Sequence, residues 1–259
     1  MPVTVGIDVG SISTKAVLLI NGTWQSELRP TGAQPKVSAL TAVEELLSRA
    51  GQKRESVDFI IATGYGRGGV EFANKKITEI TCHAKGAQFL VPGTDMVIDI
   101  GGQDSKVIKT DGSGGVLDFS MNDKCAAGTG RFLEVMAGAL DTEVDRLGSL
   151  SAQAEPVEIS SMCTVFAESE VISLLAQDVP RERVVAGIHR AVARRVAAMA
   201  ERLGLGDSIV FTGGVAKNQG VLRALSLSLN RDIAVHEHCQ MAGALGAALL
   251  ASEQSASLD

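Results

Sequence analysis

A short motif that occurs twice constrains the fold of this chain more than any other feature of its sequence. The first copy spans residues 7–15 and the second spans residues 98–106. In each copy an apolar run ends in Asp-x-Gly, a few small or polar residues follow, and a lysine opens a second apolar run. Apolar runs that flank a turn of small and polar residues are typical of a β-hairpin. We therefore expect one hairpin to open each half of the chain.

Outside the hairpins, stretches with helical periodicity alternate with short apolar runs. The expected helices cover residues 37–50, 130–140, 165–176, 183–203, 218–229 and 242–251, and the expected strands cover residues 59–63, 208–212 and 233–236. Alternating strands and helices indicate an α/β fold. A chain of 259 residues is long enough to form two lobes, each with its own core.

The composition excludes several classes of protein. With 45% hydrophobic and 21% charged residues, the chain should fold as a globular protein. A formal net charge of -6 and the lack of a basic stripe argue against nucleic acid as a partner, because such binding depends on clustered Lys and Arg. The first residues enter a strand pattern without a signal peptide, and the apolar run 241–251 is too short to cross a membrane. We expect a cytoplasmic protein.

The turns of both hairpins have the composition of phosphate-binding loops. Gly, Ser and Thr let several backbone N–H groups point at one anion without bulky side chains in the way. Asp8 or Asp99, at the strand end before each turn, could orient a hydrated Mg²⁺ ion or the attacking water. Lys15 or Lys106 could screen phosphate charge. The candidate nucleotide residues of the two turns are Gly10, Ser11, Ile12, Ser13, Thr14 and Lys15, and Gly101, Gly102, Gln103 and Asp104.

A third glycine-rich turn, residues 212–218, follows an expected strand and precedes an expected helix. Its residues Gly213, Gly214, Val215 and Asn218 would let the backbone approach the adenosine closely. Any one of the three turns is equally consistent with an ordinary surface loop. Their combination resembles the superfamily of actin, heat-shock ATPases and sugar kinases, a two-lobed α/β fold that binds ATP in the cleft between its lobes. That resemblance implies lobe I at residues 1–94 plus 240–259, lobe II at residues 95–239, and Gln240 near the mouth of the cleft.

Two of the four cysteines lie in similar surroundings. Cys125 and Cys163 each come just ahead of an expected helix, whose free N–H groups would stabilise a thiolate and the extra electron of a metal centre. A four-iron cluster takes four thiolates, so a symmetric homodimer could share one cluster by supplying both residues from each subunit. A four-thiolate zinc site fits the spacing equally well. Cys82 and Cys239 are expected to be buried. Cys82 and His83 are adjacent in the sequence, so on a helix their side chains point apart and do not suit a nucleophile and its base; burial is the expectation for this pair too.

The segments around Cys125 and Cys163 resemble a known family. Residues 122–132 and 163–170 are similar to the signature segments of the BadF/BadG/BcrA/BcrD family, the ATPase activators that reduce 2-hydroxyacyl-CoA dehydratases and their relatives. The likeness includes residues 62–67, 97–104 and 212–215 and covers nearly the whole chain. It implies a homodimer with one 4Fe-4S cluster, bound by Cys125 and Cys163 of each subunit, and an ATP site in each protomer.

The resemblance also implies the reaction, an ATP-dependent transfer of an electron. A low-potential donor such as a ferredoxin or flavodoxin would reduce the cluster, and ATP hydrolysis would drive the electron to an iron-sulfur acceptor. The candidate catalytic residues are Asp8, Asp99, Gln103 and Asp104. The acceptor would be a 2-hydroxyacyl-CoA dehydratase or a double-cubane cluster reductase, and the residues do not distinguish the two. Two alternatives stay open: a small-molecule kinase of the same fold, with Asp104 as its base, and a non-redox ATPase scaffold.

Overall fold

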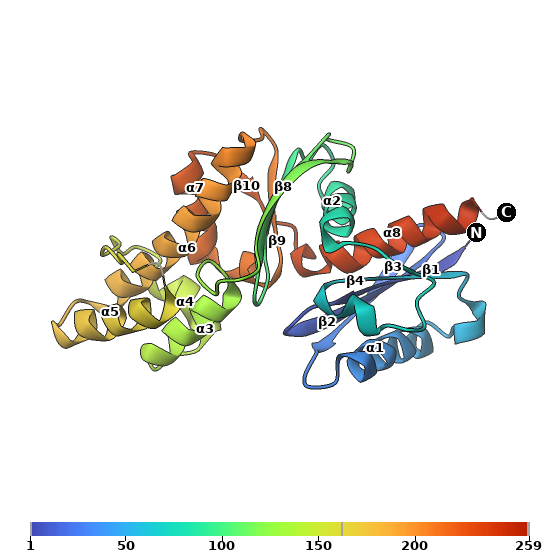
Figure 1. The fold of residues 1–259 in the computed structure, drawn as a ribbon, viewed down its shortest axis with the longest axis horizontal. Helices are drawn as coiled ribbons and strands as arrows, with labels where there is room; N and C mark the ends of the chain where they lie inside the picture. The colour runs from blue at the N-terminus through green and yellow to red at the C-terminus, as the bar shows by residue number, and fades with distance from the viewer. Residues whose placement is uncertain (1, 162, 258–259) are drawn as a thin grey trace. The chain divides into compact units, whose positions relative to one another are not determined.

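The computed structural model describes residues 2–161 and 163–257, which form two compact units (Figure 1). Within the described residues, unit 1 comprises 2–95, 110–117 and 236–257, and unit 2 comprises 96–109, 118–161 and 163–235. Each unit is built around one five-stranded sheet with helices packed against it. The α/β fold predicted from the sequence is confirmed.

The sheet of unit 1 has the strand order β3-β2-β1-β4-β5. Strands β1 (Val3–Val9), β2 (Ser13–Ile20) and β3 (Thr23–Pro30) form an antiparallel meander, and β4 (Phe59–Thr63) and then β5 (Lys75–Lys76) add in parallel on the other side of β1. The helices of this unit are α1 (Pro35–Arg49), α2 (Glu79–Leu90) and α8 (Ala242–Ala256), with short 3-10 helices η1 (Arg54–Ser56), η2 (Tyr65–Gly69) and η4 (Cys239–Met241).

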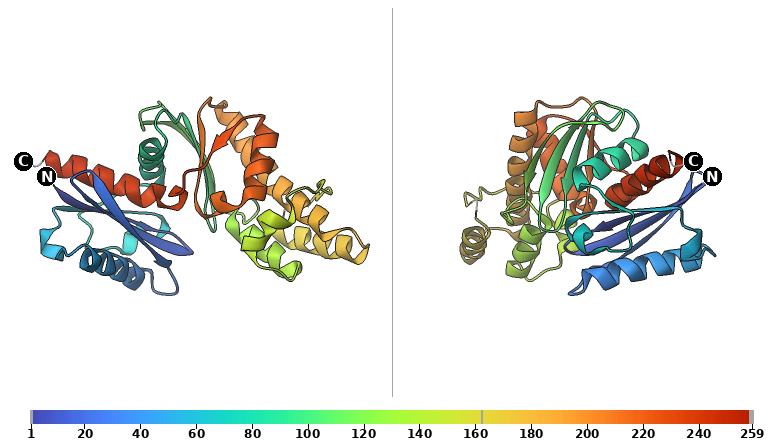
Figure 2. Two further views of the ribbon diagram at one scale, coloured as in Figure 1. Left: turned by 180° about the vertical axis from the view of Figure 1, so that it is seen from behind. Right: turned by 45° about the vertical axis from the view of Figure 1, so that its right-hand side comes forward.

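The two faces of this sheet are covered by different helices. Because successive side chains of a strand point to opposite faces, β2 divides its apolar residues between two cores. Ala16 and Leu18 pack with the residues of α1, whereas Val17 and Leu19 pack with those of α8. Figures 1 and 2 show α1 and α8 on opposite sides of the sheet. The last helix of the chain therefore belongs to the same unit as the first strand.

Helix α8 approaches its neighbours closely because small residues line the contact. A Cβ atom at Gly6 of β1 would collide with the backbone of α8 at Ala244, and one at Gly86 of α2 would collide with the Ala242 carbonyl. Many residues of α8 are Ala or Gly, and most of these are buried. The contact is thus one of backbone against backbone, which tolerates no added side chain.

The second sheet repeats the strand order of the first. Its order is β10-β9-β6-β7-β8, with β6 (Met96–Ile100) antiparallel to β7 (Ser105–Thr110) and parallel to β9 (Ile209–Thr212). The outer strands are β8 (Val116–Asn122) and β10 (Ile233–Ala234). The helices of unit 2 are α3 (Gly130–Ala139), α4 (Val144–Leu150), α5 (Thr164–Ala176), α6 (Arg181–Leu203) and α7 (Gln219–Leu229), with the 3-10 helix η3 (Gly214–Lys217).

The internal repeat extends beyond the motif that predicted it. In register, Asp8 lies opposite Lys15 on one side and Thr63 on the other, and Asp99 has Lys106 and Thr212 in the same places. A glycine with a φ of +86° or +87° follows each of these threonines, and a 3-10 helix follows each glycine. Both predicted hairpins are confirmed, and each belongs to a duplicated strand-turn-strand unit.

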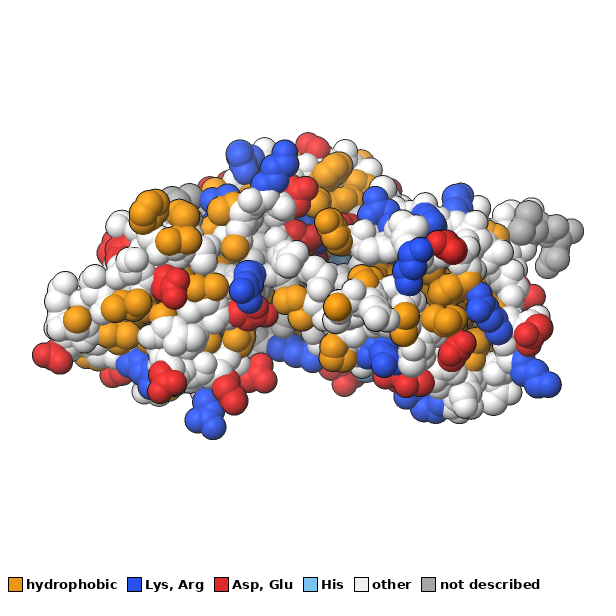
Figure 3. All heavy atoms as spheres, turned by 60° about the horizontal axis from the view of Figure 1, so that its bottom comes forward, with side chains coloured by type: hydrophobic (Ala, Val, Ile, Leu, Met, Phe, Trp, Pro, Cys, Tyr) orange, Lys and Arg blue, Asp and Glu red, His pale blue; other side chains and the backbone are white. Residues whose placement is uncertain are grey.

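On the face drawn in Figure 3, acidic and basic side chains are both spread over the surface. Across the described residues, no helix combines the length and the apolar character needed to cross a bilayer.

Candidate functional site

The first predicted phosphate turn joins β1 to β2 in unit 1. The Gly10 N–H donates to the Ser13 carbonyl at 3.1 Å and closes the turn. Thr31 braces it, since its hydroxyl donates to the Gly10 carbonyl at 2.8 Å and its N–H donates to the Ile12 carbonyl at 2.8 Å. The predicted residues Gly10 to Lys15 therefore form one tight turn. At its base, Lys15 Nζ lies 3.2 Å from Asp8 Oδ2.

The second predicted turn has the same construction in unit 2 but is more deeply buried. The Gly101 N–H donates to the Asp104 carbonyl at 3.0 Å. Lys106, with 1% of its surface exposed, places Nζ 3.2 Å from Asp99 Oδ2 and 2.8 Å from Asp104 Oδ1. The Thr212 hydroxyl donates to Asp99 Oδ1 at 2.9 Å. One buried ammonium thus fixes both carboxylates, including Asp104, the base that the kinase alternative requires.

The third predicted turn closes against the second one. Gly213 has a φ of +87°, and a Cβ there would collide with the Ile100 carbonyl and lie 2.8 Å from Asp99 Oδ1. Glycine is required at this position for both its backbone angle and its close approach. Unit 2 therefore brings three of the predicted nucleotide residues together: Asp99, Gly101 and Gly213.

Three other predicted nucleotide residues lie elsewhere in the two units, and one of them has a local structural role. Asn218 caps helix α7, with Oδ1 accepting hydrogen bonds from the N–H groups of Gly220 at 2.9 Å and Val221 at 3.2 Å. Such a cap satisfies two N–H groups that the helix leaves free. Gln240 is half-buried in η4 of unit 1. Val215 is buried within η3.

Cys163 is the N-cap residue of α5, and its side chain is exposed. Its carbonyl accepts the Ala167 N–H at 2.9 Å. Cys163 therefore lies directly before the first residue of a helix, as predicted. Met162, beside it, lies outside the described residues.

Helix α3 begins at Gly130, as predicted, and Cys125 lies in the segment ahead of it rather than at its N-cap. Helix α3 has Thr129 as its N-cap, and a turn of residues 126–129 with Gly128 at a φ of +84° separates the helix from Cys125. Asn122 holds this turn: its Nδ2 donates to the Cys125 carbonyl at 2.8 Å and to the Ala127 carbonyl at 3.0 Å. The half-buried Cys125 is therefore positioned by an amide side chain rather than by a helix end.

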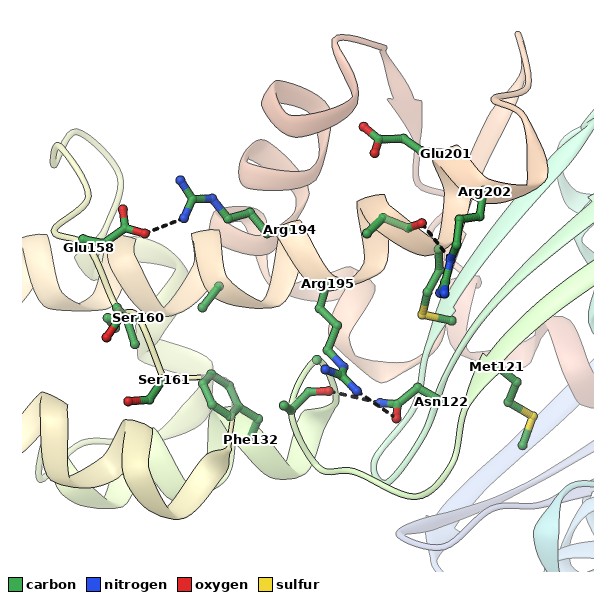
Figure 4. A pocket seen from close by; sticks show the side chains of 16 residues that line it. Met121, Asn122, Phe132, Glu158, Ser160, Ser161, Arg194, Arg195, Glu201 and Arg202 are labelled. Carbon is green, nitrogen blue, oxygen red and sulfur yellow. Dashed lines mark hydrogen bonds and ion pairs between the residues drawn. The ribbon is translucent and has the colours of Figure 1, made fainter.

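The two cysteine segments border one pocket of about 860 Å³ (Figure 4). Its walls include Ala127 and Gly128, just after Cys125, and Ser160 and Ser161, just before Cys163. Helices α3 and α5, which follow the two cysteines, also pack against each other.

Arg195 of α6 points across this pocket toward Asn122, as Figure 4 shows. Its Nη2 lies 3.5 Å from Asn122 Oδ1, and its methylene groups approach Gly128. In the same pocket, Arg194 pairs with Glu158 at 2.6 Å. Arg195 thus supports the residue that holds the Cys125 turn.

A direct backbone link joins the second phosphate turn to the helix after Cys125. The Gly130 N–H donates to the Gly101 carbonyl at 2.9 Å, and the Arg131 N–H donates to the Gly102 carbonyl at 2.7 Å. The first N–H groups of a helix have no partner within it, so here the phosphate turn supplies those partners. Within unit 2, these two hydrogen bonds therefore join the helix start to the turn.

The remaining cysteines are buried in unit 1, as expected. Burial raises the pKa of the Cys82 thiol to about 12, and Cys239 is 2% exposed. His83 is also buried. No group of three or more His, Cys, Asp or Glu side chains that could hold a metal ion occurs within residues 2–161 and 163–257 of a single chain.

Four residues of this site were not identified from the sequence. They are Asn122, Gly130, Glu170, whose carboxylate accepts hydrogen bonds from the Ser160 and Ser161 N–H groups, and Arg195. The first three lie inside the two signature segments, and this position in the sequence could have marked them as candidates. Their hydrogen-bond partners, in contrast, depend on the fold. Arg195 is far away in the sequence, and only the packing of α6 brings it to Asn122.

Comparison with known proteins identifies the family. The model of the BadF/BadG/BcrA/BcrD ATPase family matches residues 5–251. The activator of lactoyl-CoA dehydratase from Anaerotignum propionicum is 50% identical to this chain, with 96% of this chain and 97% of the relative covered.

Solved structures agree with this assignment. Component A of (R)-2-hydroxyglutaryl-CoA dehydratase from Acidaminococcus fermentans superposes with a TM-score of 0.95 at 46% identity, covering 99% of this chain and 100% of the other. The activator of 2-hydroxyisocaproyl-CoA dehydratase from Clostridium difficile, with bound ADPNP, superposes with a TM-score of 0.91 at 45% identity. The match covers 99% of this chain and 96% of the other.

A more distant structure identifies the broader fold. A ROK family glucokinase from Streptomyces griseus has a TM-score of 0.61 at 16% identity over 97% of this chain and 99% of the other. This likeness concerns the fold alone and confirms the predicted sugar kinase-like architecture. Together with the close relatives, it leads to one conclusion: this chain belongs to the BadF/BadG/BcrA/BcrD ATPase family.

Proposed function

We propose that this chain is an ATP-dependent electron-transfer activator, in which nucleotide binding repositions an iron-sulfur centre shared by two copies of the chain. The observation that carries this proposal is the pair of hydrogen bonds from Gly130 and Arg131 to the carbonyls of Gly101 and Gly102. These bonds join the phosphate turn of unit 2 to the helix that follows Cys125.

The Asp-Gly turns would bind the nucleotide and its metal ion. Two turns rich in backbone N–H groups, each with a carboxylate at its base, suit phosphate and hydrated Mg²⁺. Asp8 of unit 1, and Asp99, Gln103 and Asp104 of unit 2, would orient the waters of the ion or the attacking water, and Gly213 and Gly214 would approach the adenosine. Asp99 is held by Lys106 and Thr212, so its orientation is fixed before any ligand binds. A relative of 45% identity that binds ADPNP supports this assignment.

Cys125 and Cys163 would bind the cluster. Both thiols are accessible and lie on segments that border one pocket, whereas Cys82 and Cys239 are buried in the other unit. One chain therefore offers two accessible thiols, and a four-thiolate centre requires a second copy. When bound, a 4Fe-4S cluster stores one low-potential electron. The N-terminus of α5 would stabilise the Cys163 thiolate in that state.

The backbone link explains how ATP could act on the cysteines. A nucleotide shifts an equilibrium between two arrangements only if its affinity for them differs. A phosphate bound at residues 101–104 would move or fix that turn, and α3 would follow through Gly130 and Arg131. The Cys125 turn, which leads into α3, would then take a new position or a new exposure to solvent, and either change alters a reduction potential.

The partners of this reaction follow from the family. Relatives are named as activators of CoA-ester dehydratases, which supports an iron-sulfur dehydratase or a double-cubane cluster reductase as the electron acceptor. A ferredoxin or flavodoxin would supply the electron. We also propose that lobe I comprises residues 1–94 plus 240–259 and lobe II residues 95–239.

Anaerobic purification tests the proposal. The protein should be a homodimer that carries four iron atoms and four labile sulfides per pair of chains, and Cys125→Ser or Cys163→Ser should remove the iron. The potential of the centre, or its rate of electron transfer to a dehydratase, should change when ATP replaces ADP. Zinc without labile sulfide, or a potential and a rate that are the same with both nucleotides, would rule this function out.

A further inference from the structure

One acidic side chain of α5 holds the segment in front of Cys163. Glu170 Oε1 accepts hydrogen bonds from the Ser160 N–H at 2.9 Å and the Ser160 hydroxyl at 3.0 Å, and Oε2 accepts the Ser161 N–H at 2.9 Å. Residues 155–161 have no regular secondary structure, so the path of this segment depends on isolated contacts such as these. Hydrogen bonds from neutral donors to a carboxylate are stronger than bonds between neutral groups.

The same helix also holds the backbone of Cys163. The Cys163 carbonyl accepts the Ala167 N–H at 2.9 Å, within the first turn of α5. Glu170 is located one turn further along the helix and reaches back to Ser160 and Ser161. The loop of residues 155–161 is therefore attached to α5 through Glu170, and Cys163 is the N-cap residue of the same helix. Hydrogen bonds to α5 thus hold the backbone at Ser160, Ser161 and Cys163, although the Cys163 side chain is exposed.

We infer that Glu170 is a positioning residue for Cys163, which sets the direction in which this thiol is presented to a metal centre and keeps a negative charge near it. The inference rests on the proposed function only for the identity of the metal, since the attachment of the loop is a property of the chain. A negative charge close to a redox centre disfavours the added electron. Glu170 would therefore lower the potential of the centre and make its reduced form a stronger reductant.

Glu168 offers a matched control in the same helix. It carries the same charge and is half-buried, and among the described residues it accepts no hydrogen bond from the segment before Cys163. Glu170→Gln removes the charge and puts an N–H donor opposite the donors of Ser160 or Ser161. Glu170→Asp keeps the charge but shortens the reach of the carboxylate. Comparing these variants separates the effect of charge from that of position.

The first measurement uses the metal-free protein and needs no cluster. The labelling rates of Cys163 and Cys125 with a thiol reagent are followed residue by residue by mass spectrometry. Glu170→Gln and Glu170→Asp should both change the rate at Cys163 by about tenfold and leave Cys125 unchanged, because the loop loses strong hydrogen bonds. Glu168→Gln should match the unaltered protein at both residues. Equal Cys163 rates in all four proteins would overturn the inference.

The second measurement uses the protein with its metal centre. Glu170→Gln should lose the centre to a chelator several-fold faster and should have a higher midpoint potential, whereas Glu170→Asp should share the faster loss and retain the lower potential. An unchanged chelation rate in Glu170→Gln would also overturn the inference. If Glu170→Gln does not fold, Ser160→Ala, which removes one of the three bonds, should show smaller changes in the same direction. Altered Cys163 labelling in a protein that proves to bind no iron would contradict the proposed function and leave the positioning role intact.

Discussion

The Gly101 carbonyl accepts the N–H of Gly130 at 2.9 Å, and a methyl group added at Gly130 would crowd that oxygen. A Cβ at Gly130 would lie 3.0 Å from that oxygen and 3.3 Å from Gly102 Cα. Gly130→Ala should therefore displace the 101–104 turn and weaken binding of a non-hydrolysable ATP analogue by about tenfold, the effect of the 1–3 kcal/mol that overpacking typically costs. Isothermal titration calorimetry measures this affinity.

The same helix contains the control for that experiment. A Cβ at Gly138 of α3 meets no atom within 4 Å. Gly138→Ala should leave the affinity unchanged and stabilise the protein by up to about 1 kcal/mol, because alanine is the better helix former. An affinity for Gly130→Ala equal to that of Gly138→Ala would contradict the role given to the backbone link.

Lys106 and Lys15 occupy equivalent positions in the repeat but differ in burial. The Lys106 side chain is 2% exposed and contacts two carboxylates, whereas the Lys15 side chain is 14% exposed and contacts one. Removing one partner of a buried ion pair leaves an uncompensated charge, so Lys106→Met should lower the free energy of unfolding by about 3–5 kcal/mol. Lys15→Met should lower the free energy of unfolding by a smaller amount. Urea denaturation of both variants gives the comparison, and equal losses would show that burial does not decide the effect.

The four cysteines should separate into two reactivity classes in the metal-free protein. Cys163 is exposed and Cys125 is half-buried, whereas Cys239 is buried and burial raises the pKa of Cys82 to about 12. Since the thiolate is the reactive form, a thiol reagent at pH 8 should label Cys163 and Cys125 in the folded protein and the other two only after unfolding. Rapid labelling of Cys82 under native conditions would contradict its described environment.

His189 makes the stability of unit 2 depend on pH. Its ring is 1% exposed, its Nδ1 lies 2.9 Å from the Ser151 hydroxyl, and burial, together with the nearby Arg223, lowers its pKa to about 4. Below an unfolded-state pKa of about 6.5, the unfolded chain binds a proton that the folded chain does not. Stability should therefore be independent of this group above pH 6.5 and fall, by on the order of 3 kcal/mol, as the pH drops to 4.

Replacing His189 checks that dependence. His189→Gln cannot titrate in this range, so its free energy of unfolding should fall less steeply between pH 6.5 and pH 4, even if the variant is less stable at pH 7. Chemical denaturation at several pH values gives both slopes. Identical slopes would mean that other groups cause the acid sensitivity.

Asn122 should control the Cys125 turn in the way that Glu170 is inferred to control the Cys163 loop. Its amide donates to the Cys125 and Ala127 carbonyls, and Arg195 approaches its oxygen. Asn122→Ala should speed thiol labelling of Cys125 several-fold and leave Cys163 unaffected, because two hydrogen bonds that close the turn are lost. An effect of equal size at both cysteines would point to general loosening of unit 2 instead.

Much of this architecture could be predicted from the sequence, because the repeat and the helical periodicities are local signals. The hairpins at residues 7–15 and 98–106 and the long helix α6 are examples. Strands β3 and β8 were not predicted, and their surroundings explain why. Most residues of both strands are exposed or half-buried, so they lack the apolar run that marks a buried strand.

At the candidate site, too, local features could be predicted from the sequence and tertiary contacts could not. The sequence motif correctly indicated turns at Asp8 and Asp99, since a carboxylate, glycines and a lysine at fixed spacing specify their own geometry. Tertiary contacts were not predictable in this way. The partners of Lys106 and the hydrogen bonds of Glu170 depend on which segments the fold brings together, and the separation of Cys125 from α3 depends on the backbone angle at Gly128.

The contact of α8 with Gly6 and Gly86 has a consequence for how the protein is made. During synthesis, residues 96–235 leave the ribosome before α8 does, so unit 2 can complete its core while the first sheet still lacks the cover of one face. In unit 1, Val17 and Leu19 therefore stay uncovered until α8 has left the ribosome. A nascent chain stalled before residue 242 should therefore expose apolar surface to chaperones from its earliest segment rather than from its most recent one.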